Sequence, residues 1–573
     1  MLNRYYEQEL GHLRGLATEF AARNPALAPM LGANSAGDPD VERLLEGVAF
    51  LTSLMRRRLD DDFPEFIQTL AQLLFPHTLR PLPCMTIMQY EPRAALEGPV
   101  VIPAGTEFAS VPVDGLRTLF RASFPVTVEP LELLAARWEG GGTQARSLRL
   151  EFNFTGVAPK DWKGERLRLF LGDSQTDAAR LFLLLQRYVR EVRIGTEGGP
   201  LTVLPASSIE AAGLRPDLEL LPWPVGAHPA WRVLYEYFAL PEKLLFLDLT
   251  GFPRWQSRGP STRFSVQFVF NQIPDWAPNI GESSFILNAT PAVNLFTQDA
   301  HPIRVDHRQP EYRIHPIDRN GSTEGIFSVD QVRARMADGT EYECHPFSAF
   351  TEGDEASYNL RIHPSALTQD YDHYLSLPYA KGATPETQTL SIRVTCTHGN
   401  LPESLRLGDI CEPTDNSPAR IGFRNIVGIT AHCPPVVDNA LLWHVLSHLN
   451  ANHLALAKEG RLRDLLALYV PPRQFDAHRH AAAQRSLESI ENVQVDTRRR
   501  IVRGMPVEGS EVRIECRGDH FPGPGNLFLF GTVLDEFLAG TTALNTFSAL
   551  TLVDTVNGET LTWPAKIGRA RLL

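Results

Sequence analysis

Two histidines four residues apart give the strongest catalytic signal in the chain. His444 and His448 lie in the stretch PPVVDNALLWHVLSHLNANHLALA, and this spacing places both side chains on one face of a helix. Zinc proteases of the H-E-x-x-H type space two metal ligands in this way. The glutamate that would activate the water is missing, because Val445 stands in its place. We interpret both histidines as structural, and a metal-dependent hydrolase stays open as the alternative.

The helix that must carry these histidines is one of a pair. Pro434 and Pro435 end the preceding segment, and Asp438 or Asn439 can cap the helix by accepting an unpaired backbone N–H. A second helical pattern covers Arg461–Tyr469. The apolar residues at helical spacing in the first helix are Leu442, Val445, Leu449 and Leu456. The pair predicts a packing centre for the C-terminal half, and beside the histidines Trp443 is interpreted as a packing or interface aromatic.

Other chemical signals are weaker. Glu236 and Glu242 could form a carboxylate pair for acid–base catalysis, but nothing in the sequence aligns them, and Glu242 beside Lys243 is expected to face water. The chain has no G-x-x-x-x-G-K-[ST] loop for a nucleotide and no G-x-S-x-G nucleophile turn. We therefore expect no catalytic residue, no cofactor and no metal site.

Composition and charge indicate a folded protein of the cytoplasm. The chain has 573 residues, of which 21% are charged and 43% apolar, and its net charge is −12. Negative charge argues against a nucleic-acid partner. Six cysteines without a C-x-x-C pair suit reduced thiols. The polar N-terminus argues against a signal peptide, and no apolar run is long enough to insert in a membrane.

The first 82 residues read as a helical segment. One apolar stripe runs from Leu2 to Phe20, a second helix opens at Asp38-Pro39, and a third is expected to start near Pro64 and to stop at Phe75. Apolar faces as wide as these are expected to be covered from solvent by other protein surface. Either the protein's own β domains or another chain supplies it, and both possibilities stay open here.

The remainder reads as short alternating strands separated by Gly, Pro and Asp, which is typical of antiparallel sheets. A helix over Thr176–Arg190 interrupts them. We predict a multidomain α+β fold of mostly antiparallel β domains, with further helices in the C-terminal part. The predicted units are a helical segment 1–82, β-rich domains 83–255 and 256–400, and an α+β domain 401–573. Trp255–Pro260 and Asp370–Thr387 are the candidate linkers.

Several stretches, in this order, resemble the TssF family (also called ImpG or VasA), a baseplate subunit of bacterial type VI secretion systems. They cover nearly the whole chain, and none of them is a catalytic motif. They are MLNRYYEQELGHLRGLATEFAARNP at the N-terminus, DPDVERLLEGVAFL (Asp38–Leu51), FPEFIQTLAQLLFPH (Phe63–His77), PCMTIMQYEP (Pro83–Pro92), EYFALPEKLLFLDL (Glu236–Leu249), ATPAVNLF (Ala289–Phe296), DHRQPEYRI (Asp306–Ile314), VTCTHGNLPESL (Val394–Leu405) and LLWHVLSHLNANHLAL (Leu441–Leu456).

The resemblance implies structural work without catalysis. Proteins of this family form a wedge of two TssF copies and one TssG, to which TssK and TssE attach. Several wedges surround the spike hub, VgrG, and support the contractile tube and sheath. The fold would be similar to that of wedge proteins in contractile-phage baseplates. The assembly docks on the cytoplasmic face of the inner-membrane complex, so the chain itself would not enter the membrane.

A physical hypothesis follows from this resemblance. The N-terminal and C-terminal helices would supply amphipathic faces to a helical bundle shared with the second copy and TssG. Two identical chains around one partner cannot be fully symmetric, so Trp255–Pro260 or Asp370–Thr387 is expected to adopt two conformations. The residues predicted to form the protein interface are Tyr5, Tyr6, Leu13, Phe20, Leu442, Trp443 and Leu449. A metal-dependent hydrolase and a ligand-binding protein remain as alternatives.

Overall fold

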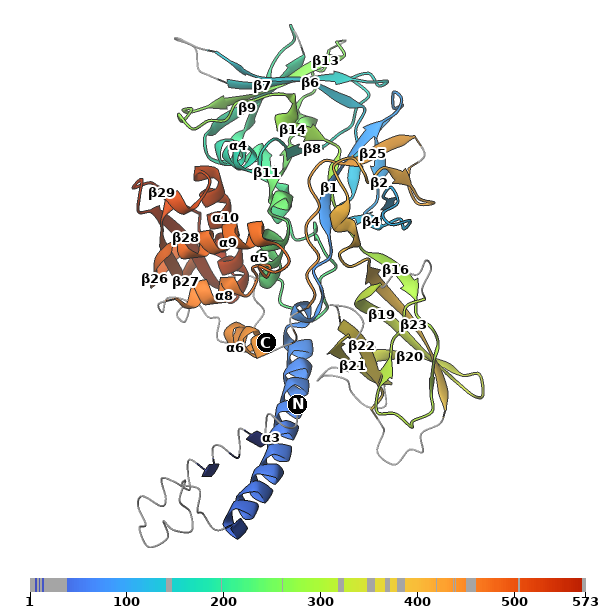
Figure 1. Ribbon diagram of the computed structural model, residues 1–573. Helices are drawn as coiled ribbons and strands as arrows, with labels where there is room; N and C mark the ends of the chain where they lie inside the picture. Colours follow the sequence, from blue (N-terminus) through green and yellow to red (C-terminus); the bar gives the residue numbers. More distant parts are fainter. Residues whose placement is uncertain are drawn as a thin grey trace.

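The protein combines a long helical arm with a body of several β-sheets (Figure 1). A computed structural model describes residues 6–7, 10, 13–14, 39–140, 147–196, 198–259, 261–317, 324–347, 356–365, 371–378, 387–418, 420–435, 437, 439–449, 460–502 and 505–568. The mixed α+β class and the predominance of antiparallel pairing, both predicted from the sequence, are confirmed.

The arm is one continuous helix, α3 (Pro39–Leu74), which projects from the body (Figure 1). The prediction of two helices with a break near Pro64 is wrong. A proline inside a helix removes one backbone hydrogen bond and crowds the preceding turn. Over 36 residues, however, the hydrogen bonds on both sides keep the helix continuous. The short 3-10 helix η1 (Pro76–Leu79) then leads into the body.

The arm leads into a six-stranded antiparallel sheet, which contains the first strand of the body. In sheet order its strands are β24 (Glu412–Pro413), β3 (Glu107–Ala109), β4 (Leu119–Ala122), β15 (Ala289–Val293), β1 (Met85–Pro92) and β25 (Ile421–Asn425). A separate pair, β2 (Val100–Ile102) and β5 (Val126–Val128), lies beside it. Tyr90, Phe108, Phe120 and Phe423 form the centre of the small core between them.

Two further sheets form the part of the body farthest from the arm (Figure 1). The five-stranded sheet has the order β10 (Thr202–Pro205), β9 (Val189–Thr196), β13 (Arg263–Phe270), β7 (Ser147–Phe154) and β6 (Leu131–Glu139). The four-stranded sheet has the order β11 (Ile209–Ala211), β12 (Phe246–Thr250), β8 (Arg166–Leu171) and β14 (Phe285–Leu287). Helix α4 (Gln175–Arg187) follows β8 and begins where the Ser174 hydroxyl accepts the Asp177 backbone N–H at 3.2 Å.

An eight-stranded sheet forms a separate lobe on one side of the arm's base (Figure 1). Its strands are β16 (Phe296–Asp299), β17 (Ile303–Val305), β18 (Tyr312–Arg313), β19 (Gly325–Met336), β20 (Glu341–Pro346), β21 (Ser357–Pro364), β22 (Tyr371–Ser376) and β23 (Gln388–Thr397). Among the described strands of this lobe, only β20 and β21 pair in parallel. Because β22 falls inside Asp370–Thr387, that segment is not a simple flexible linker, and this prediction is corrected.

The C-terminal unit lies on the other side and contains a parallel crossover (Figure 1). Strands β27 and β28 are parallel, and the helix α10 connects them across one face of the sheet. The elements of the unit are α8 (Arg461–Ala467), α9 (Ala477–Glu488), β26 (Ile490–Val502), β27 (Met505–Cys516), α10 (Pro524–Thr541), β28 (Thr546–Asp554), β29 (Thr560–Thr562) and β30 (Lys566–Ile567). Helix α10 is apolar all round because sheet and body enclose it.

Two helices between these units complete the description. They are α5 (Ala230–Ala239) and α6 (Asn439–Leu449). The remaining 3-10 turns are η2 (Ala206–Ser208), η3 (Ala212–Leu214), η4 (Pro241–Leu245), η5 (Phe252–Arg254), η6 (Glu282–Ser284), η7 (Leu401–Ser404) and η8 (Gly518–His520).

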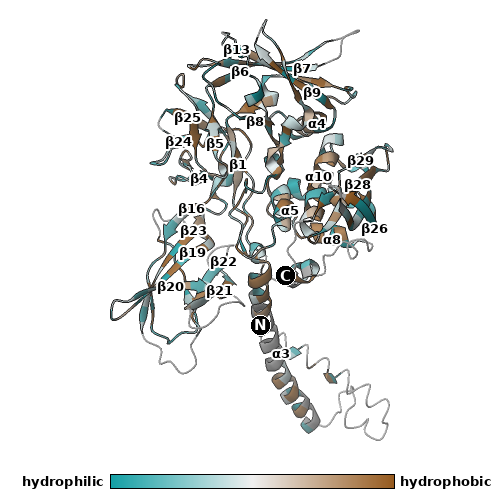
Figure 2. Cartoon of the chain, turned by 180° about the vertical axis from the view of Figure 1, so that it is seen from behind, coloured by the Kyte–Doolittle hydropathy of each residue, from teal (hydrophilic) through white to brown (hydrophobic). Residues whose placement is uncertain are grey.

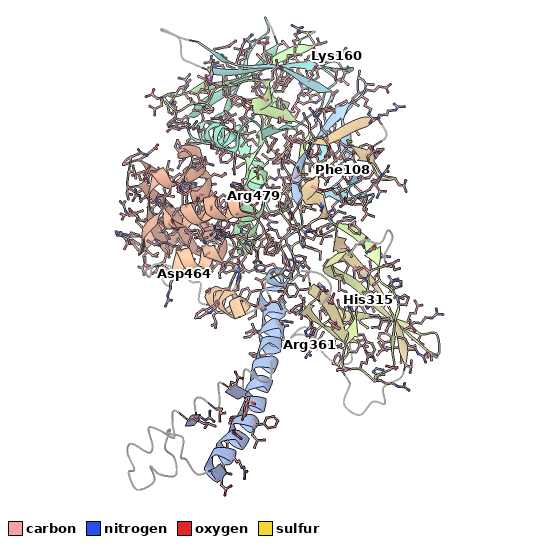
Figure 3. All side chains as sticks on the ribbon, in the orientation of Figure 1. Phe108, Lys160, His315, Arg361, Asp464 and Arg479 are labelled. Atoms are coloured by element: carbon pink, nitrogen blue, oxygen red, sulfur yellow. The ribbon has the colours of Figure 1, made fainter. Side chains whose placement is uncertain are left out.

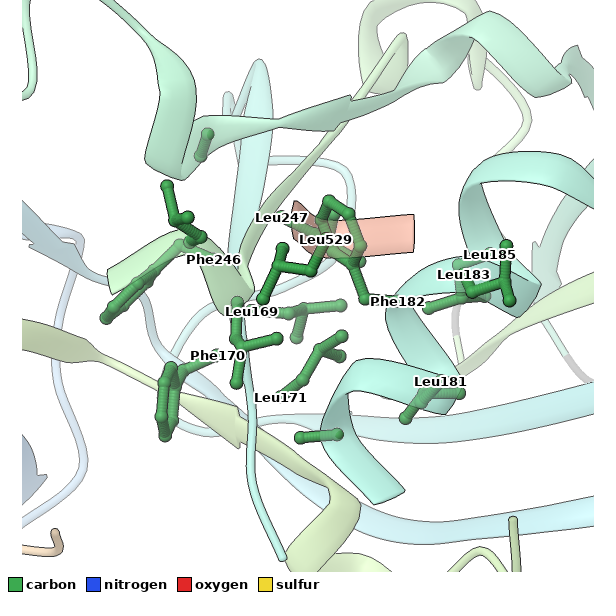
Figure 4. Packing of buried hydrophobic residues seen from close by; sticks show 14 of the residues in the cluster. Leu169, Phe170, Leu171, Leu181, Phe182, Leu183, Leu185, Phe246, Leu247 and Leu529 are labelled. Atoms are coloured by element: carbon green, nitrogen blue, oxygen red, sulfur yellow. The ribbon is translucent and has the colours of Figure 1, made fainter. Parts of the chain in front are cut away.

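One large apolar core joins the middle sheets to the C-terminal unit. Leu181, Phe182 and Leu185 of α4 face β8 and β12, and Leu529 of α10 meets them from the C-terminal unit (Figure 4). The buried side chains of this cluster come from many elements between Met85 and Trp563. The C-terminal unit is therefore fixed to the body by continuous packing and not by a tether.

The predicted linker Trp255–Pro260 is also fixed, at least as far as Gly259, where the described segment ends. Trp255 is buried and packs on Phe264 with ring centroids 5.2 Å apart. Arg258 donates to the carbonyl oxygens of Trp162 and, at 3.2 Å, of Pro159. This segment is not a loose hinge, and that prediction is wrong. Strand β13 moreover pairs with β7 and β9, so the pairing does not follow the predicted limit at 255/256, and the domain limits stay predictions.

A buried ion pair holds α5 to η4. Lys243 Nζ contacts Glu236 Oε2, and both side chains are almost fully buried. The backbone N–H of Leu220 donates to the other Glu236 oxygen at 2.8 Å. Glu242 is also largely enclosed, with Arg479 Nη2 at 3.7 Å, so the prediction that Glu242 faces water is wrong. Glu236 and Glu242 therefore serve packing, each with a different cation.

We expect Lys243→Ala to destabilise the body by about 3–5 kcal/mol, because it leaves the Glu236 carboxylate buried without its cation. The double variant Lys243→Met with Glu236→Leu removes both charges and should recover most of this loss. Calorimetric unfolding of the three proteins measures the difference. A Lys243→Ala protein as stable as the parent would contradict the role of the pair.

Candidate functional site: the helical arm and its junction with the body

The base of the arm is anchored by one apolar cluster and one amide. Ile67 and Ala71 of α3, and Phe75 directly after it, are buried against Leu441 and Val445 of α6. On the eight-stranded lobe, the Gln68 side chain donates to the Ile362 carbonyl oxygen at 3.1 Å and accepts from the Ile362 N–H at 3.4 Å. The base therefore contacts α6 and the edge of β21 together.

The predicted histidine pair lies on the buried face of α6. His448 Nδ1 is hydrogen-bonded to the backbone carbonyl of His444, and His448 Nε2 to the hydroxyl of Tyr469. The same hydroxyl lies 3.4 Å from His77 Nε2. His444 and His448 stack with ring centroids 6.4 Å apart. Three segments that are remote in sequence thus meet at the Tyr469 oxygen.

The direction of these hydrogen bonds follows from the chemistry of the groups. A carbonyl can only accept, so His448 Nδ1 carries the proton and, in the neutral ring, Nε2 accepts. Tyr469 therefore donates its hydroxyl proton to His448, and its oxygen accepts from His77 Nε2–H. His77 Nδ1 is then the unprotonated nitrogen. It is buried and has no hydrogen-bond partner among the described residues, which suits a neutral ring.

Aromatic rings surround this chain of hydrogen bonds. Trp231 of α5 meets His448 edge-on at 4.3 Å between centroids, and Phe75 lies 4.7 Å from the same ring. Trp223 stacks on His77 at 4.8 Å. Phe537 of α10 contacts Trp231 at 5.1 Å. The enclosure connects the arm, α5, α6 and the C-terminal unit.

Burial shifts the pKa values of these groups. Desolvation lowers the pKa of His448 to about 4, with a backbone hydrogen bond opposing and His444 assisting. Desolvation also lowers the pKa of His77 well below its usual value, assisted by His448, His444 and Arg80. The pKa of the Tyr469 hydroxyl is raised well above its usual value by burial. At neutral pH His448, His77 and Tyr469 are therefore uncharged.

The metal-site interpretation finds no support in this geometry. Both ring nitrogens of His448 are already engaged by protein groups. Within the described ranges, no three His, Cys, Asp or Glu side chains converge in a way that could hold a metal ion. His448 therefore joins the arm to the body.

Above its base the arm presents apolar side chains to solvent. Leu44, Val48, Leu51 and Phe66 lie on one face of α3, since their separations are close to whole turns of about 3.6 residues. Their exposed fractions are Leu44 69%, Val48 45%, Leu51 58% and Phe66 63%. We call these four residues the arm stripe. Figure 2 shows the hydrophobic colouring along the projecting helix. The protein's own sheets leave this face open.

The predicted interface residues are distributed around the arm and α6. Tyr6 and Leu13 are half-buried, and Trp443 is 66% exposed on α6. Tyr5 and Phe20 lie outside the described residues, as do the side chains of Leu442 and Leu449. The arm stripe was not among the predicted interface residues, although the apolar spacing from Leu44 to Leu51 was its signal.

A cleft of about 390 Å³ lies between α5 and α9, lined by Tyr237, Phe238, Arg479 and Phe521. Arg479, labelled in Figure 3, donates to the Ala239 carbonyl oxygen at 2.7 Å and faces Asp476 at 3.6 Å. These contacts hold Arg479 in the wall of the cleft. The cleft thus lies at the joint between the body and the C-terminal unit.

A rigid multi-sheet body with an exposed amphipathic arm is typical of a structural subunit that assembles with other protein chains. The model of the family described as "Type VI secretion system, TssF" matches residues 1–570. The chain belongs to the TssF family. The type VI secretion system component TssF1 of Pseudomonas aeruginosa PAO1 is 28% identical over 617 residues, covering 98% of each chain. The predicted family, and with it a structural and non-enzymatic component, is confirmed.

Two solved structures share the fold. A chain of the TssK-TssF-TssG baseplate subcomplex, determined by cryo-electron microscopy, superposes with a TM-score of 0.79 at 26% identity, covering 93% of this chain and 99% of that one. A chain of the type VI secretion baseplate complex gives a TM-score of 0.61 at 23% identity, covering 99% and 100%. Among the described residues, no helix has the length and apolarity needed to cross a membrane.

The lowered pKa values of His448 and His77 predict a stability that depends on pH. The folded pKa of His448 is depressed, so its contribution is complete above its unfolded value of about 6.5 and is lost as pH falls toward 4. The shift corresponds to about 3 kcal/mol, and His77 acts in the same direction. Lowering the pH from 7 to 4.5 should therefore destabilise the parent more than His448→Gln.

Calorimetric melting across this pH range measures the difference. The matched control is His345→Gln, because His345 is exposed and should leave the pH dependence of the parent unchanged. Identical pH dependence for the parent and His448→Gln would show that the junction does not carry this effect.

Proposed function

We propose that this chain is the arm-bearing wedge subunit of a type VI secretion baseplate. Two copies would join one TssG-type subunit in a wedge, and TssK, TssE, the VgrG hub and the sheath would attach around it. The proposal extends to a position at the cytoplasmic face of the inner membrane. The TssK-TssF-TssG subcomplex, in which a chain of the same fold assembles, supports the partners.

The arm stripe is the observation that carries this proposal. Four large apolar side chains in register along a projecting helix are the contact pattern of a helical bundle. Trp443 adds an exposed aromatic on α6, the helix against which the arm's base packs. A partner helix lying along the stripe could therefore continue onto Trp443. The predicted contacts of Tyr5, Tyr6, Leu13, Phe20, Leu442 and Leu449 belong to the same proposal.

The body would then act as a rigid spacer. Its large core joins the middle sheets to the C-terminal unit, so a load on the arm reaches both without a loose linker between them. The hydrogen bonds at the junction give the arm a fixed exit direction. Asymmetry between two copies would have to arise outside the tightly packed segment around Trp255.

Co-expression with the TssG-type subunit of the same system tests the proposal. Size-exclusion chromatography with light scattering should give a complex of two copies of this chain with one partner. Leu51→Glu places a charge in the arm stripe and should weaken the complex by at least tenfold, since a buried charge at a helical contact is costly.

Glu46→Arg is the matched control, because Glu46 is exposed on the opposite side of the same helix. It should leave the complex intact. A parent chain that remains monomeric beside its partner would refute the wedge proposal. An intact complex with Leu51→Glu would remove the arm stripe from the interface.

A further inference from the structure

Strand β26 is the longest open edge in the described part of the protein. It has 13 residues and pairs only with β27. The other strands at the ends of sheet paths are between two and nine residues long, β6 being the longest of them at nine. An open edge presents a row of unpaired backbone donors and acceptors, which can pair with another chain. Because β26 is the longest of these edges, it can form the most backbone hydrogen bonds with an added strand.

The distal half of β26 is uncovered on both faces. Val493 and Val495 line a small apolar cavity beneath α10, which covers the proximal half. From Asp496 to Ile501 every side chain is exposed, and Ile501 is 79% exposed. In Figures 1 and 2 the strand lies at the outer side of the C-terminal unit. No other helix or sheet would therefore block a segment that approaches this edge.

Charge on this edge selects the kind of segment that fits. Arg498, Arg499 and Arg500 follow one another on β26, whereas the chain as a whole carries −12. Glu508 faces Arg499 at 3.5 Å, and Glu511 accepts from Arg500 at 2.6 Å. Within the described ranges no carboxylate lies within salt-bridge distance of Arg498. Arg498 is thus the arginine of this run that is available to a carboxylate of a partner, while Glu508 and Glu511 lie close to the other two and Asp496 lies on the same strand.

We propose that the β26 edge is a docking site for an extended, acidic segment of another baseplate subunit, which adds a strand to the C-terminal sheet. Backbone hydrogen bonds would supply the pairing, and Arg498 would select an acidic side chain in the added strand. This inference rests on the proposed function, because it places the partner in the same assembly. It concerns a surface on the C-terminal unit, whereas the arm stripe lies on α3.

A second copy of this chain does not suit the site. Pairing two β26 edges antiparallel about Arg499 would bring the two arginine runs directly opposite each other, and like charges at opposed positions destabilise a sheet. Arginines on an edge strand also discourage self-association in general. Opposite charge in the partner removes this repulsion, so the same residues that exclude a copy favour an acidic strand.

Hydrogen–deuterium exchange tests the added strand directly. The full chain is compared with its complex with the TssG- and TssK-type subunits of the same system. Peptides covering residues 490–502 should exchange at least tenfold more slowly in the complex, while peptides from β28, already paired on both sides, should change little. Slow exchange reports backbone pairing, which contact by side chains alone would not produce.

Charge reversal on β26 is the second test. Arg498→Glu should weaken the complex about tenfold at low salt and remove the protection of β26. Arg513→Glu is the matched control, because Arg513 is an exposed arginine on β27, inside the same sheet, and should change affinity less than threefold. A complex that forms with β26 exchanging as in the free chain overturns this inference alone. Absence of any complex overturns both it and the proposed function.

Discussion

The hydrogen bonds of the Tyr469 hydroxyl are the interaction on which the rest of the architecture depends. The hydroxyl donates to His448 and accepts from His77, and so joins the entry of the arm, helix α6 and the segment after α8. In a dry enclosure the loss of either of these two hydrogen bonds is costly, because the groups that it leaves unpaired are buried. The hydrogen-bonding groups of the arm, α6 and the C-terminal unit can therefore all find their partners only in one relative arrangement of these elements. A projecting helix held only by apolar contacts could rotate about its base, and this one is oriented by hydrogen bonds.

Around that point the body distributes its stability through packing and a few buried charges. Lys243 and Glu236 neutralise each other at the edge of the large core, and Asp248 is enclosed by Arg168 at 2.7 Å with Arg166 and Arg215 farther out. Buried charges require matched geometry. They consequently specify which elements meet, whereas the apolar side chains supply most of the driving force. A core shared by sheets from distant parts of the sequence makes the body respond as a unit.

The sequence predicts local elements better than it predicts their partners. Strands β4, β5 and β7 are short runs of the kind predicted for this part of the chain, because alternating residues between turns leave few choices of register. Pro64 misled the prediction, since a single proline is outweighed by long helical stretches on both sides. Trp255 lies in a Pro- and Gly-containing segment that reads as a linker, yet its ring fills the core. The shared face of His444 and His448 could be predicted from spacing, but no local pattern connects them to His77 or Tyr469, which are distant in sequence.

The exposed arm stripe also limits the free energy of association that one arm can provide alone. Burying the part of these four apolar side chains that is still exposed contributes roughly 3–7 kcal/mol, whereas association costs about 4–15 kcal/mol in lost freedom. One arm lying on one partner helix would therefore be close to break-even. Several helices sharing their stripes in a bundle lose that freedom once for many contacts, and a second contact such as the β26 edge would act at high effective concentration. A subunit with one strong body and weak, separate outer contacts is consequently expected to assemble stably only when its partners are present together.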